Sequence, residues 1–96
     1  MTRLTILMTS AAFALSGCLL ALPPKGVSAE QIAAYDEAVA SIGCDMIGES
    51  DYLPVELQTG LTREQVIQVT EYKLAREEAV TLPEGGVRLT TGVCAV

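Results

Sequence analysis

Three carboxylates lie close together in the middle of the chain, at Asp45, Glu49 and Asp51. Carboxylate oxygens are the ligands that Ca²⁺ prefers, and the ion takes about six to eight oxygens. The spacing differs from that of the common Asp-x-Asp-x-Asp-Gly calcium loop, and Gly48 is the only glycine inside the stretch. The pattern therefore predicts a solvated acidic loop without a metal, and a calcium or small-ligand site there is the alternative.

The composition offers few residues that could catalyse a reaction. The chain contains no histidine, which is the commonest general base and metal ligand, so no serine can be paired with one. The acidic residues offer many carboxylate pairs, but none stands in a distinctive setting. Gly85 and Gly86 are expected in a turn and not in a phosphate-binding loop. We therefore predict a protein that is not an enzyme and uses no cofactor.

The first residues have the order of an export signal. Arg3 supplies a positive charge, and a mostly apolar run follows it and ends in Leu15-Ser16-Gly17-Cys18. This tetrapeptide resembles the lipobox of bacterial membrane lipoproteins. The resemblance implies that residues 1–17 are a cleaved signal peptide and that Cys18 carries lipid such as palmitate. Several acyl chains would make a stable membrane anchor, where a single chain binds only marginally.

Two other fates of the N-terminal segment stay open. Val27-Ser28-Ala29 also fits an ordinary signal peptidase site, and cleavage after Ala29 would release a soluble periplasmic domain. The residues that follow Cys18 are apolar too, so Leu4 to Leu22 is long enough to remain as a membrane-spanning helix. Each of the three fates places the rest of the chain in the cell envelope, facing the periplasm.

Two cysteines remain after Cys18, namely Cys44 and Cys94. An even pair in an oxidising compartment predicts one disulfide. The bond would close a loop of about 50 residues, and the chain-entropy model assigns such a loop on the order of 4 kcal/mol. A redox-active pair is the alternative, but such pairs usually have the Cys-x-x-Cys spacing that activates a thiolate. The long separation favours a structural bond.

The charge of the chain limits its partners. After Gly17, five basic residues stand against all twelve acidic ones. Binding to nucleic acid depends on Lys and Arg neutralising phosphates, so we expect no nucleic-acid partner. The negative net charge also disfavours contact with anionic lipid headgroups. We therefore expect the protein to bind the membrane through its N-terminal lipid. Another envelope protein is the expected partner.

The globular part is predicted to be a small α+β domain over residues 29–96, joined to the anchor by a tether over residues 18–28. Ser28 with Gln31 forms a capping box, and apolar residues recur behind it at steps of three and four. This pattern predicts a helix over about 29–42. Gly43 would end it, because glycine enters the left-handed conformation without penalty, and Cys44 could then face inward.

Caps and alternation predict the remaining elements. Asp51 and Thr62 are expected to begin helices, and the turn residues of Pro83-Glu84-Gly85-Gly86 stand between two short alternating runs. A hairpin alone is barely stable in water, so it should pack on the helices. The predicted elements are a short helix over about 52–58, a second main helix over about 63–78, and hairpin strands at about 80–82 and 87–90.

One heptapeptide, Gly60-Leu61-Thr62-Arg63-Glu64-Gln65-Val66, resembles the helix start of the small accessory lipoproteins of the outer-membrane β-barrel assembly machinery. Those proteins combine a lipobox with a helical pair and a three-stranded sheet. The present sequence lacks the Gly-x-Pro that follows the helix there, and it has room for two strands. In physical terms, the stretch has a glycine that ends one helix and a capping box that begins the next. Both features occur at the ends of many unrelated helices.

These observations favour one function. We expect a non-enzymatic, membrane-anchored envelope lipoprotein that acts as a structural or protein-interaction module. The alternative is a periplasmic small-ligand or calcium-binding protein that uses the loop from Asp45 to Asp51.

Overall fold

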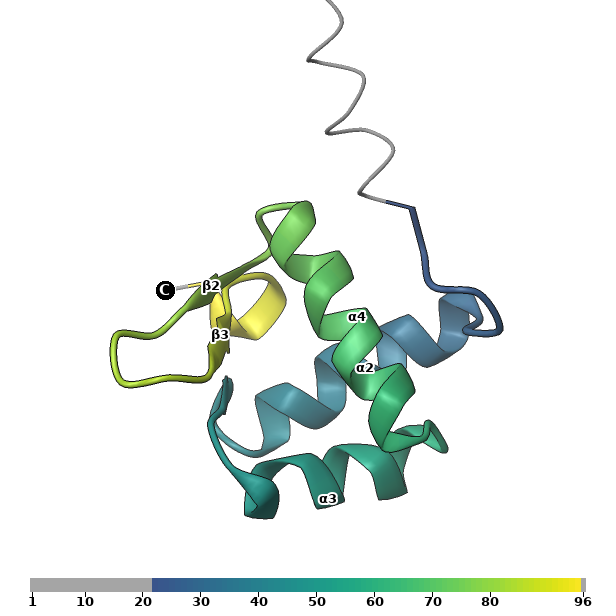
Figure 1. The fold of residues 1–96 in the computed structure, drawn as a ribbon, viewed down its shortest axis with the longest axis horizontal. Coiled ribbons are helices and arrows are strands. Elements are labelled where there is room, and N and C mark those ends of the chain that lie inside the picture. Colours follow the sequence, from purple (N-terminus) through teal and green to yellow (C-terminus); the bar gives the residue numbers. More distant parts are fainter. Residues whose placement is uncertain (1–21, 96) are drawn as a thin grey trace, which may run out of the picture.

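A computed structural model describes residues 22–95, so the predicted signal peptide and Cys18 lie outside the described residues. Three helices and one antiparallel sheet with strand order β1-β3-β2 confirm the predicted α+β class. The helices pack together, and the sheet lies beside them at one side of the domain (Figure 1). The elements in chain order are α2 (Ala29–Ser41), β1 (Asp45–Met46), α3 (Glu49–Thr59), α4 (Arg63–Ala75), β2 (Ala79–Thr81), β3 (Val87–Leu89) and a 3₁₀ turn, η1 (Gly92–Cys94).

Helix α2 begins and ends where the sequence predicts. The Ser28 hydroxyl accepts a hydrogen bond from the backbone N–H of Gln31, and the Gln31 side chain accepts one from the Ser28 N–H, both at 3.0 Å. After the helix, Gly43 has φ 101° and Cys44 has φ 76°. The Cys44 N–H donates to the Val39 carbonyl at 2.9 Å. The chain therefore reverses at this point, and Cys44 packs against the core as expected.

The prediction of an acidic loop over 45–51 was wrong, because the stretch has regular secondary structure. The stretch holds strand β1 and the first turn of α3, which begins at Glu49 and not at residue 52. The Asp51 carboxylate accepts the backbone N–H groups of Ile47 and Gly48, at 2.8 and 3.2 Å. Asp51 thus caps the helix from within its first turn, where we had expected it to precede the helix. Pro54 consequently lies inside α3, where it has no N–H to donate.

Helix α4 ends three residues before the predicted end at residue 78. Its last residue is Ala75, and Glu77 adopts a left-handed conformation with φ 61°. The Glu78 N–H donates back to the Lys73 carbonyl at 2.9 Å. Both glutamates therefore lie beyond the helix, so neither charge opposes the negative end of its dipole from within the last turn.

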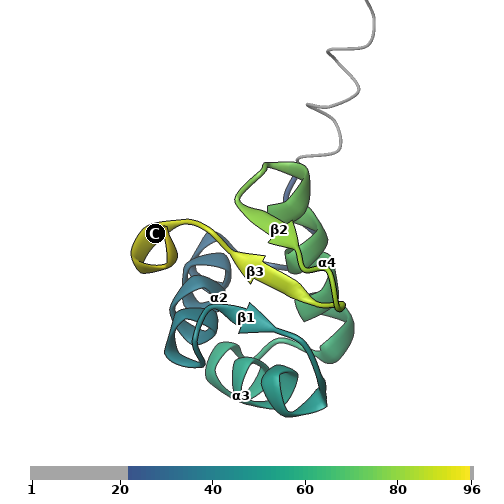
Figure 2. The ribbon, with the colours of Figure 1, turned by 90° about the vertical axis from the view of Figure 1, so that its left-hand side faces the viewer.

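The hairpin is confirmed, but the sheet has a third strand that the sequence did not reveal. Strand β1 pairs with β3, so that Asp45 lies opposite Arg88. With only two residues, β1 is too short to show an alternating pattern. Gly86 allows the close approach, because a Cβ there would lie 2.7 Å from the Met46 carbonyl oxygen. Figure 2 shows the face of the sheet, with β3 between β1 and β2 and the helices behind and below the strands in this view.

The core lies between the helices and the inner face of the sheet. It unites side chains from every element except β2, whose Ala79 is also buried. On α4 the buried face includes two polar residues, Thr70 and Lys73, beside Val66 and Val69. This mixture explains why the apolar periodicity of the segment is poor. The core cluster consists of Tyr35, Ala38, Val39, Met46, Val55, Leu61, Val66, Val69, Leu89 and Cys94.

Candidate functional site

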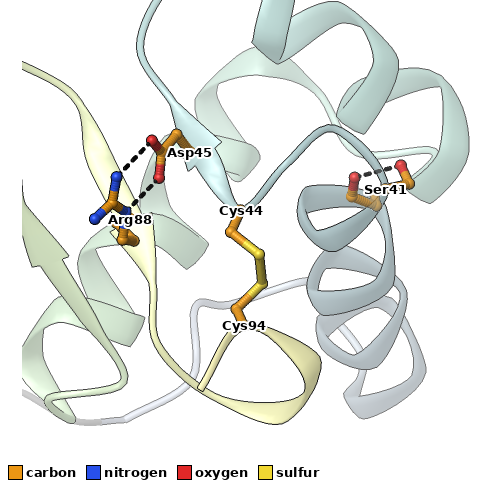
Figure 3. The surroundings of a disulfide bond; sticks show 6 residues. Ser41, Cys44, Asp45, Arg88 and Cys94 are labelled. Carbon is orange, nitrogen blue, oxygen red and sulfur yellow. Dashed lines mark hydrogen bonds and ion pairs between the residues drawn. A yellow bond between two sulfur atoms is a disulfide. The ribbon is translucent and has the colours of Figure 1, made fainter. Parts of the chain in front are cut away.

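The structure brings the two predicted disulfide partners together. The sulfur atoms of Cys44 and Cys94 are 2.09 Å apart and their Cα atoms 5.8 Å apart, a normal disulfide separation (Figure 3). Cys94 belongs to η1 and is buried, while Cys44 follows the end of α2. The carbonyl of Cys44 also accepts the Leu89 N–H at 2.9 Å. The bond therefore fastens the C-terminal turn to both α2 and the sheet.

The three carboxylates of the 45–51 stretch are not brought together. Asp45 binds Arg88 at 2.7 and 3.0 Å, as Figure 3 shows, and the hydrogen bond holds the pKa of Asp45 below its usual value. Glu49 binds Arg63 at 2.7 and 2.9 Å, with the same effect on its pKa. Asp51 caps α3. Across residues 22–95 there is no group of three or more Asp, Glu, Cys or His arranged to hold a metal ion.

A buried lysine forms the most unusual polar arrangement in the domain. Lys73 on α4 is only 5% exposed. Its Nζ lies 2.9 and 3.0 Å from the two carboxylate oxygens of Asp36 on α2, and 3.2 Å from Oε1 of Glu78. Arg76 binds the other oxygen of Glu78 at 3.0 Å. Burial raises the pKa of Glu78, but the hydrogen bonds from Arg76 and Lys73 outweigh it and leave that pKa below its usual value.

Sequence reasoning missed this lysine cluster. Lys73 is three residues after Thr70 and four after Val69, so it shares the buried face of α4. A lysine on the core side of a helix needs an acidic partner on the facing element. Asp36 directly follows the buried Tyr35, whose hydroxyl lies 2.6 Å from the Thr70 hydroxyl. A lysine on the core side of one helix and an acid beside a buried residue of another could have indicated this pair. The indication depends on knowing that α2 and α4 pack together.

Three members of the lysine cluster, Asp36, Lys73 and Glu78, line a pocket with a volume of about 630 Å³, which we call the α2–η1 pocket. Residues 91–93 of η1 and its cap form one wall, and residues of α2 form another. Because η1 is tied to the end of α2 by the Cys44–Cys94 bond, the disulfide holds the first wall in place. The lining residues are Asp36, Glu37, Ala40, Ser41, Lys73, Glu78, Thr91, Gly92 and Val93.

The end of the predicted tether lies against the domain. Val27 packs against the core, and its N–H donates to the Pro24 carbonyl at 3.4 Å. Leu22, Pro24 and Lys25 face the side of α4 across a second depression of about 520 Å³. Val27 therefore already belongs to the packed structure, one residue before the predicted end of the tether at residue 28, while Leu22 is 62% exposed.

Comparisons with known proteins add no further information on the site. No protein-family model, no curated protein and no solved structure matches the chain. No helix within residues 22–95 has the length and the apolar character needed to cross a bilayer.

Proposed function

We propose that the protein is a non-enzymatic, membrane-anchored envelope lipoprotein whose domain serves as an interaction module on the periplasmic side. The observation that carries the proposal is the Cys44–Cys94 pair at bonding distance. Disulfides persist in oxidising compartments and are rare in the cytosol. The lipobox-like tetrapeptide at residues 15–18 leads to the same compartment. Two unrelated features, one in the fold and one in the leader, thus support export.

A short connection between lipid and domain supports the anchoring role. Val27 is the first described residue that packs against the core, and it lies nine residues after Cys18. An extended chain spans at most about 3.6 Å per residue, so lipid on Cys18 would hold Val27 within about 32 Å of the membrane surface. A partner of this domain would then also lie in or close to the same membrane.

The non-catalytic part of the proposal follows from the available side chains. The chain has no histidine. Among residues 22–95, the carboxylates with lowered pKa values, Asp45, Glu49 and Glu78, all pair with cations that link elements of the fold. Such pairs are typical of structural contacts, and the calcium alternative at 45–51 gains no support from this geometry.

Metabolic labelling tests the anchor directly. Cells that express the full chain are grown with radiolabelled palmitate and then separated into membrane and soluble fractions. We expect the wild-type protein to be labelled and to sediment with membranes, while Cys18→Ala is unlabelled and is not cut before residue 18. Ser10→Ala, a change in the same leader, is the matched control and should behave as wild type.

The mature N-terminus separates the proposal from its alternatives. Mass spectrometry should find a chain that begins at Cys18. A chain that begins at Glu30 would favour the soluble periplasmic protein, and an intact Met1 in membranes would favour a spanning helix. Normal labelling and processing of Cys18→Ala would contradict the lipoprotein.

A further inference from the structure

We propose that one surface of the domain lies on the membrane and fixes the orientation of the domain there. This surface, which we call the α4–tether surface, consists of residues 22–25 and the side of α4, from Gln68 to Ala75, that faces them across the depression of about 520 Å³. Its partner is the interfacial region of a bilayer with zwitterionic headgroups. The inference rests on the proposed lipid anchor and goes beyond it, because lipid on Cys18 alone would leave the domain free to turn.

The position of the α4–tether surface in the chain favours the membrane as its partner. Leu22 is four residues after Cys18. An extended chain spans at most about 3.6 Å per residue, so a Cys18 that carries lipid lies within about 15 Å of Leu22. In Figures 1 and 2, helix α3 lies at the end of the domain opposite to the start of the described chain. The anchor therefore brings the α4–tether surface nearer to the bilayer than α3.

The side chains of the surface suit a membrane interface. Leu22 is 62% exposed and offers apolar area to lipid. Tyr72 lines the depression, and tyrosine is enriched at the level of the headgroups because its ring is amphipathic. The guanidinium carbon of Arg76 lies 5.5 Å from the centre of that ring, a contact that helps to hold the ring in place. Lys25 can bury its methylene stem while its ammonium group stays among the headgroups.

The charge of the surface permits this contact, although the chain as a whole is acidic. Lys25 and Glu71 are the charged residues that line the depression, and their charges cancel. The full chain has a net charge of −6, so anionic headgroups would repel most of its surface. A neutral surface meets no such repulsion from zwitterionic headgroups. The contact depends on apolar and interfacial side chains, and high salt should therefore leave it in place.

Helix α3 offers the rival apolar surface. Its Leu53 and Leu57 are 52% and 76% exposed. If the exposure of leucine side chains alone decided the orientation, α3 would lie on the bilayer and the domain would be turned over. The two ends of the domain therefore predict opposite orientations, and a measurement of their distances from lipid distinguishes them.

The test measures which end of the domain lies near the headgroups. The protein is expressed from its full sequence, labelled with ¹⁵N, and placed in phosphatidylcholine nanodiscs that contain a lipid with a spin-labelled headgroup. Mass spectrometry of the same sample reports the lipid on Cys18. We expect paramagnetic relaxation of the backbone amides to be at least about threefold faster at residues 22–26 and 68–76 than at residues 50–58, because interfacial residues lie at the level of the headgroups. The ratio should be the same in low salt and in 1 M NaCl.

Two variants test the surface itself. Leu22→Ser removes apolar area and Gln68→Glu adds a negative charge, so each should lower the relaxation ratio about twofold. Both side chains are exposed, so neither change should unfold the domain. Leu57→Ser, an exposed leucine on α3, is the matched control and should leave the ratio unchanged.

The outcomes separate this inference from the proposed anchor. In a protein that carries lipid on Cys18, equal relaxation at both ends, faster relaxation at α3, or an unchanged ratio in either surface variant would overturn the inference and leave the anchor intact. A protein without lipid on Cys18 would overturn both.

Discussion

Two ion clusters tie α4 to the rest of the domain, and their central cations differ in exposure. In each, one cation lies between two carboxylates. Arg63 at the start of α4 binds two glutamates of α3, and its side chain is 37% exposed. Lys73 near the end of α4 binds Asp36 of α2 and Glu78, and its side chain is 6% exposed. Arg76 also binds Glu78, so the Lys73 cluster holds a second cation, and the two clusters differ in charge count as well as in environment.

The difference shows what burial adds to an ion cluster. Water and salt screen the Arg63 cluster, so its net effect on stability is small. Arg63 also lies 4.8 Å above the centre of the Tyr52 ring, which helps to fix its position. Lys73 cannot lose its partners without becoming an uncompensated buried charge. Only the Lys73 cluster therefore combines a buried cation with a place in the lining of the α2–η1 pocket.

Removal of the disulfide should have the largest effect on stability. It should disturb the surroundings of the Lys73 cluster and leave the Arg63 cluster unchanged. The bond holds η1 beside the Lys73 cluster and touches no part of the Arg63 cluster. Cys94→Ala is expected to lower the free energy of unfolding by about 4 kcal/mol, measured by urea denaturation. Under conditions where the protein stays folded, amide shifts should be concentrated in residues 40–45 and 90–95.

The double variant Cys44→Ala/Cys94→Ala is the control, because it removes the same bond and should lose nearly the same stability. A Cys94→Ala protein as stable as wild type would show that the bond is dispensable. Shifts spread evenly to Arg63 and its partners would show that the two clusters are not separate.

Replacement of the two central cations, Lys73 and Arg63, tests directly whether the clusters differ in their effect on stability. Lys73→Met removes the buried charge and leaves two carboxylates facing each other. We expect a loss of about 2–3 kcal/mol, below the usual 3–5 kcal/mol for a broken buried pair because Asp36 is over a third exposed. Arg63→Met is the matched variant, and its loss should be clearly smaller. Urea denaturation in low salt and in 1 M NaCl measures both, and only the Arg63→Met loss should shrink in high salt.

Equal losses for the two variants, or equal responses to salt, would mean that burial does not separate the clusters. A conservative Lys73→Arg variant adds a further check. Its guanidinium is larger than an ammonium group and should not fit between α2 and Glu78 without shifting η1.

How much of this arrangement the sequence predicts depends on how local each signal is. The caps at Ser28 and Thr62, the break at Gly43 and the hairpin turn are short-range features, and all were predicted correctly. The disulfide followed from counting cysteines. Each of these predictions needs only a few neighbouring residues or a general rule about compartment.

The remaining features depend on pairing between distant segments. Strand β1 is two residues long and is defined only by its partner β3, which lies over 40 residues away. Asp51 looks like a residue that precedes a helix, and its role inside the first turn appears only with the Ile47 N–H beside it. Lys73 looks like a surface residue until α2 supplies Asp36. Patterns along one segment cannot show such contacts.

A third prediction concerns the buried contact between α2 and α4, close to the Lys73 cluster. Tyr35 lies next to Asp36 on α2, and its hydroxyl bonds to that of Thr70 at 2.6 Å. Tyr35→Phe should cost about 1 kcal/mol, the usual value for a buried hydrogen bond. Burial also raises the pKa of Tyr35 to about 12, against a smaller opposing effect of the Thr70 bond.

The sign of the resulting pH effect follows from this shift. The unfolded tyrosine ionises near pH 10, so its contribution to stability is complete below pH 10 and is lost as the pH rises towards 12. Thermal unfolding between pH 9 and 12, followed at the same time by tyrosinate absorbance, measures this loss. Tyr35→Phe should lack this part of the pH dependence. A tyrosine at position 35 that ionises near pH 10 in the folded protein would show that the α2–α4 contact is open to water.

The smallest expected effect is the response of the two clusters to acid. The pKa of Glu78 in the Lys73 cluster and that of Glu49 in the Arg63 cluster both lie below the usual 4.5. Their contributions are therefore complete above about pH 4.5 and are lost as the pH falls through the lower folded-state values. Thermal unfolding from pH 7 to pH 3 should show a shallower decline for Glu78→Gln and for Glu49→Gln than for wild type. In 1 M NaCl the Glu49→Gln curve should merge with that of wild type, because salt already removes an exposed pair. Glu78→Gln should keep part of its difference, since salt reaches its exposed partner Arg76 but not its buried partner Lys73. A difference that vanished in salt would show that ions screen both clusters equally.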